Sequence, residues 1–368
     1  MNRDTRILVA GCDTLAGAAL VDHLADHGYR RVLAPSADEL DLTHAEQVEE
    51  YVDAERPEVV FLTAGKSGGI GLNRARPAEL MRDNLLVTAN VVHASHLGGV
   101  KKLLYLASSC SYPRLAKQPM RTGALMEGPL EPTSAAYATA KLAGWQLCAA
   151  YRQQYGANFV TAIPANPFGP HDDFSADGGH VIPALLRRTH RARLDGEPTL
   201  TIWGTGAPLR EFLYAADLAD ACVFVMQQYD GAGPINLGGG VEGSIADVAH
   251  AIAEVVGYRG QLLFDVTRPD GAPRKCLDAS ELLGLGWRPR TSFFDALERT
   301  YRWYLDHVES APTDTAPRED ATDVHGAVSH AVPDSPGGRR GRPRLSERSH
   351  QESRSSVHRA GGGVGRGV

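Results

Sequence analysis

The chain has 368 residues, of which 43% are hydrophobic and 22% are charged, as is typical of a soluble globular protein with one or two buried cores. No apolar run reaches the roughly 18 to 20 residues of a membrane-spanning helix, and the N-terminus leads directly into a strand pattern, so we expect a cytoplasmic protein without membrane contact. The formal net charge of -6 argues against general affinity for nucleic acids. Five widely spaced cysteines without metal-ligand spacing predict a reducing compartment and no metal site.

The first half of the chain alternates short apolar stretches with stretches of helical periodicity. Such repetition of strand and helix builds a parallel sheet with helices on both faces. We therefore predict an α/β fold in which residues 1–170 form a doubly wound parallel sheet, a dinucleotide-binding domain of the Rossmann type. The strand-like stretches are, in chain order, RILVAG, RRVLAPS, EVVFLTAG, KKLLYLASS and NFVTAIPAN.

Beyond about residue 170 the pattern changes to longer loops and isolated helices. Residues 171–309 are predicted to form a smaller, mostly helical substrate lobe over the carboxyl ends of the strands, where open α/β sheets bind ligands. INLGGG, near residue 235, indicates a strand that returns to the sheet. Residues 310–368 contain few large apolar side chains and are predicted to be a disordered tail. A single AT-hook-like RGRPR, at 340–344, is too short a match to predict DNA binding.

The turn after the first strand, VAGCDTLAGAAL, is typical of a dinucleotide-binding loop. Gly11 and Gly17 occupy the first and last glycine positions of G-x-x-G-x-x-G, and the backbone N–H groups at the helix start suit a pyrophosphate. Thr14 replaces the middle glycine, where a side chain would crowd the phosphate, and Asp13 adds a negative charge nearby. A plain strand-to-helix turn packed with small residues would have a similar sequence.

The tip of the second strand shows neither an acid for a ribose 2′-OH nor an arginine for a 2′-phosphate. Ser36 is the evident polar candidate there, and Asp41 either contacts the adenine or caps the next helix. Without a cation or an acid, the sequence predicts weak discrimination between NADPH and NADH, within roughly tenfold.

A Y-x-x-x-K motif is formed by Tyr137 and Lys141, and the spacing places both side chains on one helix face. A lysine ammonium near a phenol lowers the phenol pKa, which prepares it for proton transfer. Ser108, at the end of the fourth strand, can hydrogen-bond the same substrate oxygen. Alone, this motif is more often a surface helix, but after the ASS sequence at a strand end it indicates a reductase site.

These motifs and several longer runs resemble the extended short-chain dehydrogenase/reductases and, more narrowly, the GDP-L-fucose synthase family. The resemblance covers nearly everything from residue 60 to residue 305. The matching runs are KSGGIG (66–71), SSCSYPRLAKQPM (108–120), LEPTSAAYATAK (130–141), NPFGPHDDF (166–174), HVIPALLRR (180–188), WGTGAPLREFLY (203–214) and PDGAPRKCLD (269–278).

The resemblance implies 3,5-epimerisation and 4-keto reduction of GDP-4-keto-6-deoxy-D-mannose to GDP-L-fucose. It assigns Cys110 and His180 as the acid and base of epimerisation, beside Ser108, Tyr137 and Lys141 for reduction. A thiol and an imidazole both titrate close enough to neutral pH for such proton transfers. Taken singly, Cys110 would more often be a small buried hydrophobe and His180 a polar loop residue.

The family also implies a GDP-sugar substrate, NADP as cofactor with NAD possible, and a homodimer. Substrate-binding residues by the resemblance are Arg188, Trp203, Arg210 and Lys275, whereas Arg187 is interpreted as part of a solvated face and Cys148 as packing. The residues assigned to the cofactor site are Gly11, Thr14, Leu15, Gly17, Ser36, Asp41, Ala64, Tyr137, Lys141, Asn166 and His180.

Two alternatives remain at this level. The same fold and site could act on another nucleotide-linked keto sugar with NADH. A non-catalytic descendant that binds a sugar nucleotide would also explain the altered glycine loop, although the five catalytic candidates together argue against it.

Overall fold

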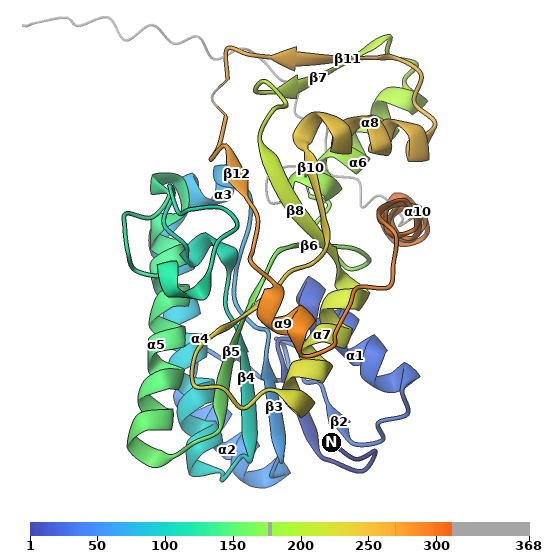
Figure 1. Ribbon diagram of the computed structural model, residues 1–368. Helices are drawn as coiled ribbons and strands as arrows, with labels where there is room; N and C mark the ends of the chain where they lie inside the picture. The colour runs from blue at the N-terminus through green and yellow to red at the C-terminus, as the bar shows by residue number, and fades with distance from the viewer. Residues whose placement is uncertain (176–178, 269, 311–368) are drawn as a thin grey trace, which may run out of the picture. The chain divides into compact units, whose positions relative to one another are not determined.

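Six short apolar strands form the central sheet of the computed structural model, which describes residues 1–175, 179–268 and 270–310. All neighbouring strands pair in parallel, in the order β2-β1-β3-β4-β5-β9. This confirms the doubly wound sheet. Strands β3, β4 and β5 lie side by side in Figure 1. The strands are β1 (Ile7–Ala10), β2 (Val32–Leu33), β3 (Val59–Leu62), β4 (Lys102–Leu106), β5 (Phe159–Pro164) and β9 (Ile235–Leu237).

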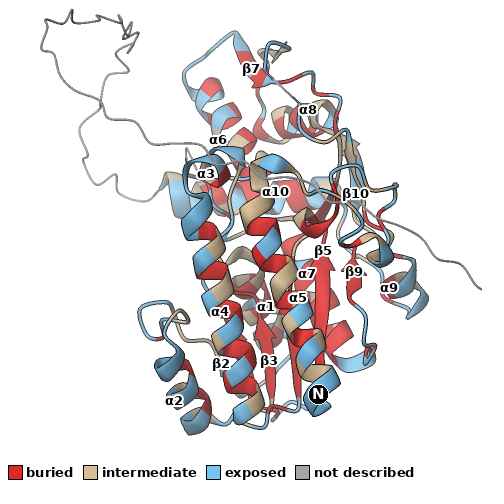
Figure 2. Ribbon diagram, turned by 90° about the vertical axis from the view of Figure 1, so that its left-hand side faces the viewer, coloured by how far each residue is buried: buried red, intermediate tan, exposed pale blue. Residues whose placement is uncertain are grey.

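Helices cover both faces of this sheet, which explains why its strands are continuous apolar runs rather than alternating ones. Helix α1 (Leu15–Asp26) packs against α7 (Ala215–Gln228), and α4 (Pro77–Leu97) packs between α2 (Ala45–Glu55) and α5 (Ala135–Tyr155). Every residue of β3 and β5 is buried as a result (Figure 2).

Helix α5 matters most for the site because it carries Tyr137 and Lys141 on its buried face. The helix lies close to β4 because Gly144 has no side chain: a Cβ there would stand 2.4 Å from the ring of Tyr105 on β4. It ends at Gly156, whose φ of +69° is a left-handed conformation that glycine adopts without strain. The close contact of α5 with β4 sets the depth at which the Y-x-x-x-K motif lies.

The C-terminal part is mixed α and β: beside the predicted helices it contains several short strands that the sequence did not indicate. Strand β8 (Leu209–Tyr214) pairs with β6 (Asn166–Phe168), β10 (Val241–Ser244) and β12 (Arg274–Lys275). A separate pair joins β7 (Thr199–Trp203) to β11 (Gln261–Asp265), about sixty positions later in the chain. Strands this short, with partners this distant, give no local periodicity strong enough to predict them.

Helices α6 (Val181–Leu194), α8 (Ile245–Val256) and α10 (Phe293–Tyr304) form a second apolar core with these strands. Shorter helical segments complete the described chain: α3 (Ile70–Ala75), α9 (Ser280–Gly284), the 3-10 turns η1 (Ser109–Ser111), η2 (Thr122–Ala124) and η3 (Pro132–Ser134), and the π-helical turn η4 (Leu305–Glu309).

The predicted return of the chain to the sheet is confirmed, because β9 pairs with β5 in parallel. A strand of the first predicted domain also joins the second one, since β6 lies before residue 170 but pairs with β8. The boundary between 1–170 and 171–309 therefore stays a prediction. Of the predicted tail, 310–368, all but the first residue lies outside the described residues, and so does its RGRPR. Within the described ranges, no helix is long and apolar enough to cross a membrane.

Candidate active site

The catalytic candidates come from the end of β4, the first turns of α5 and the start of α6. Ser108 lies two residues after the end of β4 and caps the turn η1, with its Oγ accepting a hydrogen bond from the backbone N–H of Cys110 at 3.2 Å. His180 is the residue before α6. The structure thus brings together five residues that the sequence spreads over more than seventy positions: Ser108, Cys110, Tyr137, Lys141 and His180.

Lys141 is held between the ends of two strands. Its Nζ donates to the backbone oxygens of Ala64, after β3, at 3.4 Å and of Leu106, in β4, at 3.3 Å. The side chain is 4% exposed, and burial lowers its pKa to about 8 because an ammonium is disfavoured away from water. Its Nζ lies 6.0 Å from the centre of the Tyr137 ring, so the predicted shared face is confirmed.

Tyr137 differs from the expectation for its acidity. Burial raises the pKa of its phenol, the negative charge at Cys110 raises it further, and the hydrogen bond with Ser108 offsets only part of the effect. The expected lowering by Lys141 is therefore wrong for this arrangement. The consequence is chemical: Tyr137 holds its proton at neutral pH, which suits a proton donor to a substrate oxygen better than a base.

Cys110 makes a contact that the sequence did not predict. Lys275, 165 positions later on β12, donates from Nζ to the Cys110 Sγ at 3.3 Å. Burial alone would raise the thiol pKa, but the Lys275 ammonium, with the Ser108 hydroxyl and His180, outweighs it and lowers the pKa. Lys275, assigned by resemblance to the substrate, thus lies against the thiol and favours its thiolate.

The pKa of His180 is shifted in the opposite direction, upward. Its Nδ1 lies 3.9 Å from an Oδ1 oxygen of Asp172, a residue that the sequence analysis did not select. Burial would lower the imidazole pKa, but the Asp172 carboxylate and the negative charge at Cys110 raise it. The His180 side chain is 45% exposed, whereas that of Asp172 is buried. A lowered thiol pKa and a raised imidazole pKa favour a thiolate facing an imidazolium.

Asp172 is 8% exposed, and its buried Oδ2 has no hydrogen-bond partner among the described residues. Burial raises the pKa of this carboxyl, so it loses its charge at a higher pH than an ordinary aspartate does. The only sequence signal for it was its place in NPFGPHDDF (166–174), eight positions before His180. That run gave no indication of which of its acids would face the histidine.

We expect Lys275→Met to raise the Cys110 pKa, because the ammonium that stabilises the thiolate is lost. At neutral pH the thiolate fraction falls as the pKa rises, so alkylation of Cys110 by iodoacetamide should slow by roughly tenfold or more. Mass spectrometry of the Cys110 peptide over a pH series measures this rate. Lys275→Arg keeps the charge and should retain most of the reactivity. An unchanged pH profile in Lys275→Met would exclude the ammonium as the cause.

The first loop fits the close approach of a dinucleotide. Gly11 has a φ of +99°, and a Cβ there would stand 2.4 Å from the Cα of Ala64. A Cβ on Gly17 would stand 2.0 Å from the Gly11 carbonyl oxygen. Both glycines are therefore required by packing, and they place the N-terminus of α1 at the carboxyl end of β1, where Rossmann folds bind a pyrophosphate.

Thr14 has a local role in this loop. As N-cap of α1 it accepts a hydrogen bond from Gly17 N at 3.1 Å and donates to the Gly11 oxygen at 2.8 Å. Its hydroxyl is thus turned back into the turn. Crowding of a phosphate, as expected from the sequence, would require the hydroxyl to point outward. Leu15 begins the helix, so its backbone lies in the first turn next to this cap.

Two other cofactor candidates are engaged by their neighbours. Ser36 donates from both its N–H and its Oγ to Glu39, at 2.8 and 3.0 Å. Asp41 accepts from Thr43 N and Oγ1 at 2.9 and 2.7 Å and pairs with His44, the N-cap of α2. Within the described residues no side chain caps α2 at His44, so the capping role suggested for Asp41 is wrong.

The remaining binding candidates, Asn166 for the cofactor and three for the substrate, lie on the mixed C-terminal sheet and α6. Asn166 donates to the Glu211 carbonyl oxygen at 2.7 Å, and Arg188 donates to the carbonyl of Thr201. Trp203 is 68% exposed and stacks 5.1 Å from the Arg268 guanidinium. Arg210 is half-buried, its pKa is lowered by burial, and the charge at Cys110 acts on it. Of these four residues, Arg210 alone is electrostatically linked to the thiol.

Two further interpretations have clear outcomes. Cys148 is 1% exposed within the main core, which confirms a packing role. Arg187 is half-buried and donates to the Phe174 carbonyl oxygen at 3.2 Å, so its interpretation as part of a solvated face is wrong.

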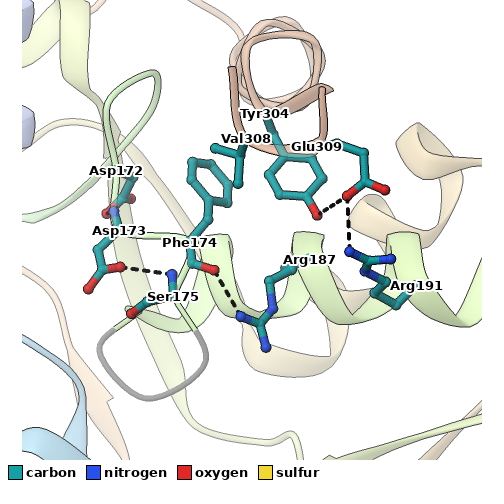
Figure 3. Close-up of a pocket in the computed structure, with 9 residues that line it drawn as sticks. All are labelled: Asp172, Asp173, Phe174, Ser175, Arg187, Arg191, Tyr304, Val308 and Glu309. Atoms are coloured by element: carbon teal, nitrogen blue, oxygen red, sulfur yellow. Dashed lines mark hydrogen bonds and ion pairs between the residues drawn. The ribbon is translucent and has the colours of Figure 1, made fainter. Parts of the chain in front are cut away.

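A cavity of about 540 Å³ lies between α6 and η4 (Figure 3). Asp172 lines it, while Arg191 and the Tyr304 hydroxyl both reach the Glu309 carboxylate across it, at 3.4 and 3.3 Å. None of Ser108, Cys110 or Tyr137 lines this cavity. The cavity is therefore not the place where these three residues meet.

Comparisons with known proteins identify the family of this chain. The model of the NAD dependent epimerase/dehydratase family matches residues 7–238. A putative GDP-L-fucose synthase 2 of Arabidopsis thaliana is 46% identical over 308 residues, 84% of this chain and 94% of that protein. The GDP-L-fucose synthase of Escherichia coli (strain K12) is 42% identical over 313 residues, 83% of this chain and 98% of that protein.

Solved structures are similar over the same part of the chain. A GDP-6-OMe-4-keto-L-xylo-heptose reductase from C. jejuni superposes with a TM-score of 0.79 at 33% identity, covering 83% of this chain and 99% of the other. A GDP-L-fucose synthetase from Naegleria fowleri bound to NADP gives a TM-score of 0.77 at 29% identity, covering 84% and 97%. The chain belongs to the NAD dependent epimerase/dehydratase family and, within it, to the family of the GDP-L-fucose synthases.

Proposed function

We propose that this protein converts GDP-4-keto-6-deoxy-D-mannose to GDP-L-fucose, by epimerisation at C3 and C5 followed by NAD(P)H-dependent reduction at C4. One observation carries the proposal: the thiol of Cys110, contacted by Lys275 at 3.3 Å, stands in the same site as Tyr137 and Lys141. A reductase needs the tyrosine and the lysine. A thiolate and an imidazolium beside them are groups for moving protons on carbon.

Epimerisation uses the acidity that the C4 ketone gives to the C3 and C5 hydrogens. The Cys110 thiolate accepts the proton from carbon, which leaves an enolate, and the His180 imidazolium returns a proton to the opposite face. The Lys275 ammonium stabilises the thiolate before the step, and the Asp172 carboxylate stabilises the imidazolium. Each inversion leaves the thiol protonated and the imidazole neutral, and proton exchange with solvent restores the thiolate and the imidazolium before the second carbon is inverted.

Reduction uses the second set of residues. Bound NAD(P)H supplies the hydride that adds to C4. Tyr137, whose raised pKa keeps its proton, donates that proton to the C4 oxygen, and Ser108 hydrogen-bonds the same oxygen. Lys141, fixed by the oxygens of Ala64 and Leu106, keeps a cation near the phenol as negative charge develops.

The binding roles belong to the same proposal. Gly11, Gly17 and the start of α1 would hold the pyrophosphate of the dinucleotide, with Ala64 beside them. Arginine guanidinium groups match phosphates in charge and geometry, so Arg188 and Arg210 are assigned to the diphosphate of the GDP-sugar, with Trp203 and Asn166 nearby. A homodimer is also part of the proposal, and sedimentation equilibrium tests it.

The test is product identification. The purified protein is incubated with GDP-4-keto-6-deoxy-D-mannose and reduced dinucleotide, and the product is analysed by NMR. GDP-L-fucose supports the proposal. A 4-reduced sugar with unchanged C3 and C5 would leave reduction but overturn epimerisation.

A second candidate, reduction of a GDP-linked keto-heptose, is favoured by the structural similarity to the C. jejuni reductase. Turnover of such a heptose in place of the 6-deoxy sugar would establish it. Absence of turnover with either substrate would favour the non-catalytic alternative.

A further inference from the structure

The acidic side chain of the first loop lies at the tip of the second strand. Asp13 Oδ2 accepts a hydrogen bond of 2.7 Å from the backbone N–H of Ala37, 24 positions later. The neighbouring Cys12 Sγ lies 3.4 and 3.2 Å from the backbone oxygens of Ala34 and Pro35, so the loop is attached to this segment at several points. These contacts fix the Asp13 carboxylate beside the end of β2.

A second carboxylate is fixed at the same place. Glu39 accepts both hydrogen bonds from Ser36, which lies in the segment that Asp13 contacts. The two acids lie close enough for Asp13 to oppose the lowering of the Glu39 pKa by Ser36. Burial raises the pKa of Cys12 to about 11, with further contributions from Asp13 and from Glu39. In the described part of the chain, neither carboxylate has an ion pair with a lysine or arginine.

The position matters because of what a dinucleotide presents there. In a doubly wound sheet, the adenosine ribose lies at the end of the second strand, where an acid accepts a hydrogen bond from its 2′-OH and an arginine accommodates a 2′-phosphate. A 2′-phosphate beside Asp13 and Glu39 would bring like charges together in a site without a compensating cation. A free 2′-hydroxyl would instead find an acceptor.

We propose that Asp13 makes the dinucleotide site of this protein selective for NADH over NADPH. The inference rests on the proposed function and deepens it by naming the hydride donor. This selectivity differs from the weak discrimination between NADPH and NADH that the sequence predicted. The sequence showed no acid after the second strand, because Asp13 belongs to the loop after the first strand. The similar structures bound to NADP are those of other proteins.

Equilibrium binding tests this directly, without turnover. NADH and NADPH are titrated separately into the purified full chain and two variants, with affinities measured by calorimetry. The wild type should bind NADH at least tenfold more tightly. Asp13→Asn removes the charge while its amide oxygen can still accept from Ala37, and should bring the two affinities within about threefold. Asp13→Arg should reverse the preference.

Asp26→Asn is the matched control. Asp26 is exposed at the far end of α1, about 17 Å along the helix from the first loop, so its charge is screened at ordinary ionic strength. This variant should keep the wild-type preference. Raising the salt concentration should reduce the ratio of NADH to NADPH affinity in the wild type. In Asp13→Asn this ratio should stay close to one.

Two results would overturn the inference: NADPH binding to the wild type as tightly as NADH, or an unchanged preference in Asp13→Asn. Either of them leaves the proposed sugar chemistry intact. Failure to bind both dinucleotides would instead overturn the reduction step along with the inference. Formation of GDP-L-fucose with NADPH as the better-bound donor would separate the two claims, supporting the function and rejecting the role of Asp13.

Discussion

Tyr137→Phe should reduce the rate of C4 reduction by roughly 10² to 10⁴, the contribution of a positioned proton donor. The raised pKa of this phenol keeps the donor protonated, and phenylalanine has no proton to give. Exchange of the C3 and C5 hydrogens should continue at close to the wild-type rate, because Cys110, His180 and Lys275 are unchanged. The variant therefore separates the two halves of the reaction.

The measurement has two parts. Oxidation of the reduced nicotinamide, followed by absorbance, reports reduction, and incubation of the ketone in deuterated water, read by NMR at C3 and C5, reports exchange. Tyr155→Phe is the control, since Tyr155 ends the same helix and is 52% exposed. Loss of exchange together with reduction in Tyr137→Phe would indicate a disrupted site rather than a missing proton donor.

Cys110→Ser should have the opposite effect. A serine hydroxyl is far less acidic than a thiol beside Lys275, so deuterium exchange and inversion at C3 and C5 should slow by roughly 10² or more. Tyr137 and Lys141 remain, so any product should arise by reduction of the unepimerised ketone. Mass spectrometry of the recovered substrate and NMR of the product give both quantities.

Cys276→Ser is a matched control for this variant. Cys276 is also partly exposed and adjoins Lys275 in the chain, but burial and nearby acids raise its pKa to about 11, which leaves it a neutral thiol. It should retain full exchange. Wild-type deuterium incorporation in Cys110→Ser would show that Cys110 is only a packed thiol, and epimerisation at this site would then require another base.

The sequence alone determined the features that depend on neighbours along the chain. Apolar runs of a few residues alternate with helical periods, and the parallel sheet follows because only helices on both faces bury such strands. The Y-x-x-x-K spacing placed Tyr137 and Lys141 on one helix face without further information. Gly11 and Gly17 likewise marked the loop, since each position excludes a Cβ.

Only the tertiary structure decided which distant charges meet. Lys275 contacts Cys110 across 165 positions, and His180 faces Asp172 from the start of α6. Asp13 accepts a hydrogen bond from Ala37, just beyond the end of β2. The mixed C-terminal sheet has the same origin, because β7 finds its partner about sixty residues later. A pKa depends on burial and on all nearby charges at once, so the raised pKa of Tyr137 and the lowered pKa of Cys110 could not follow from local sequence.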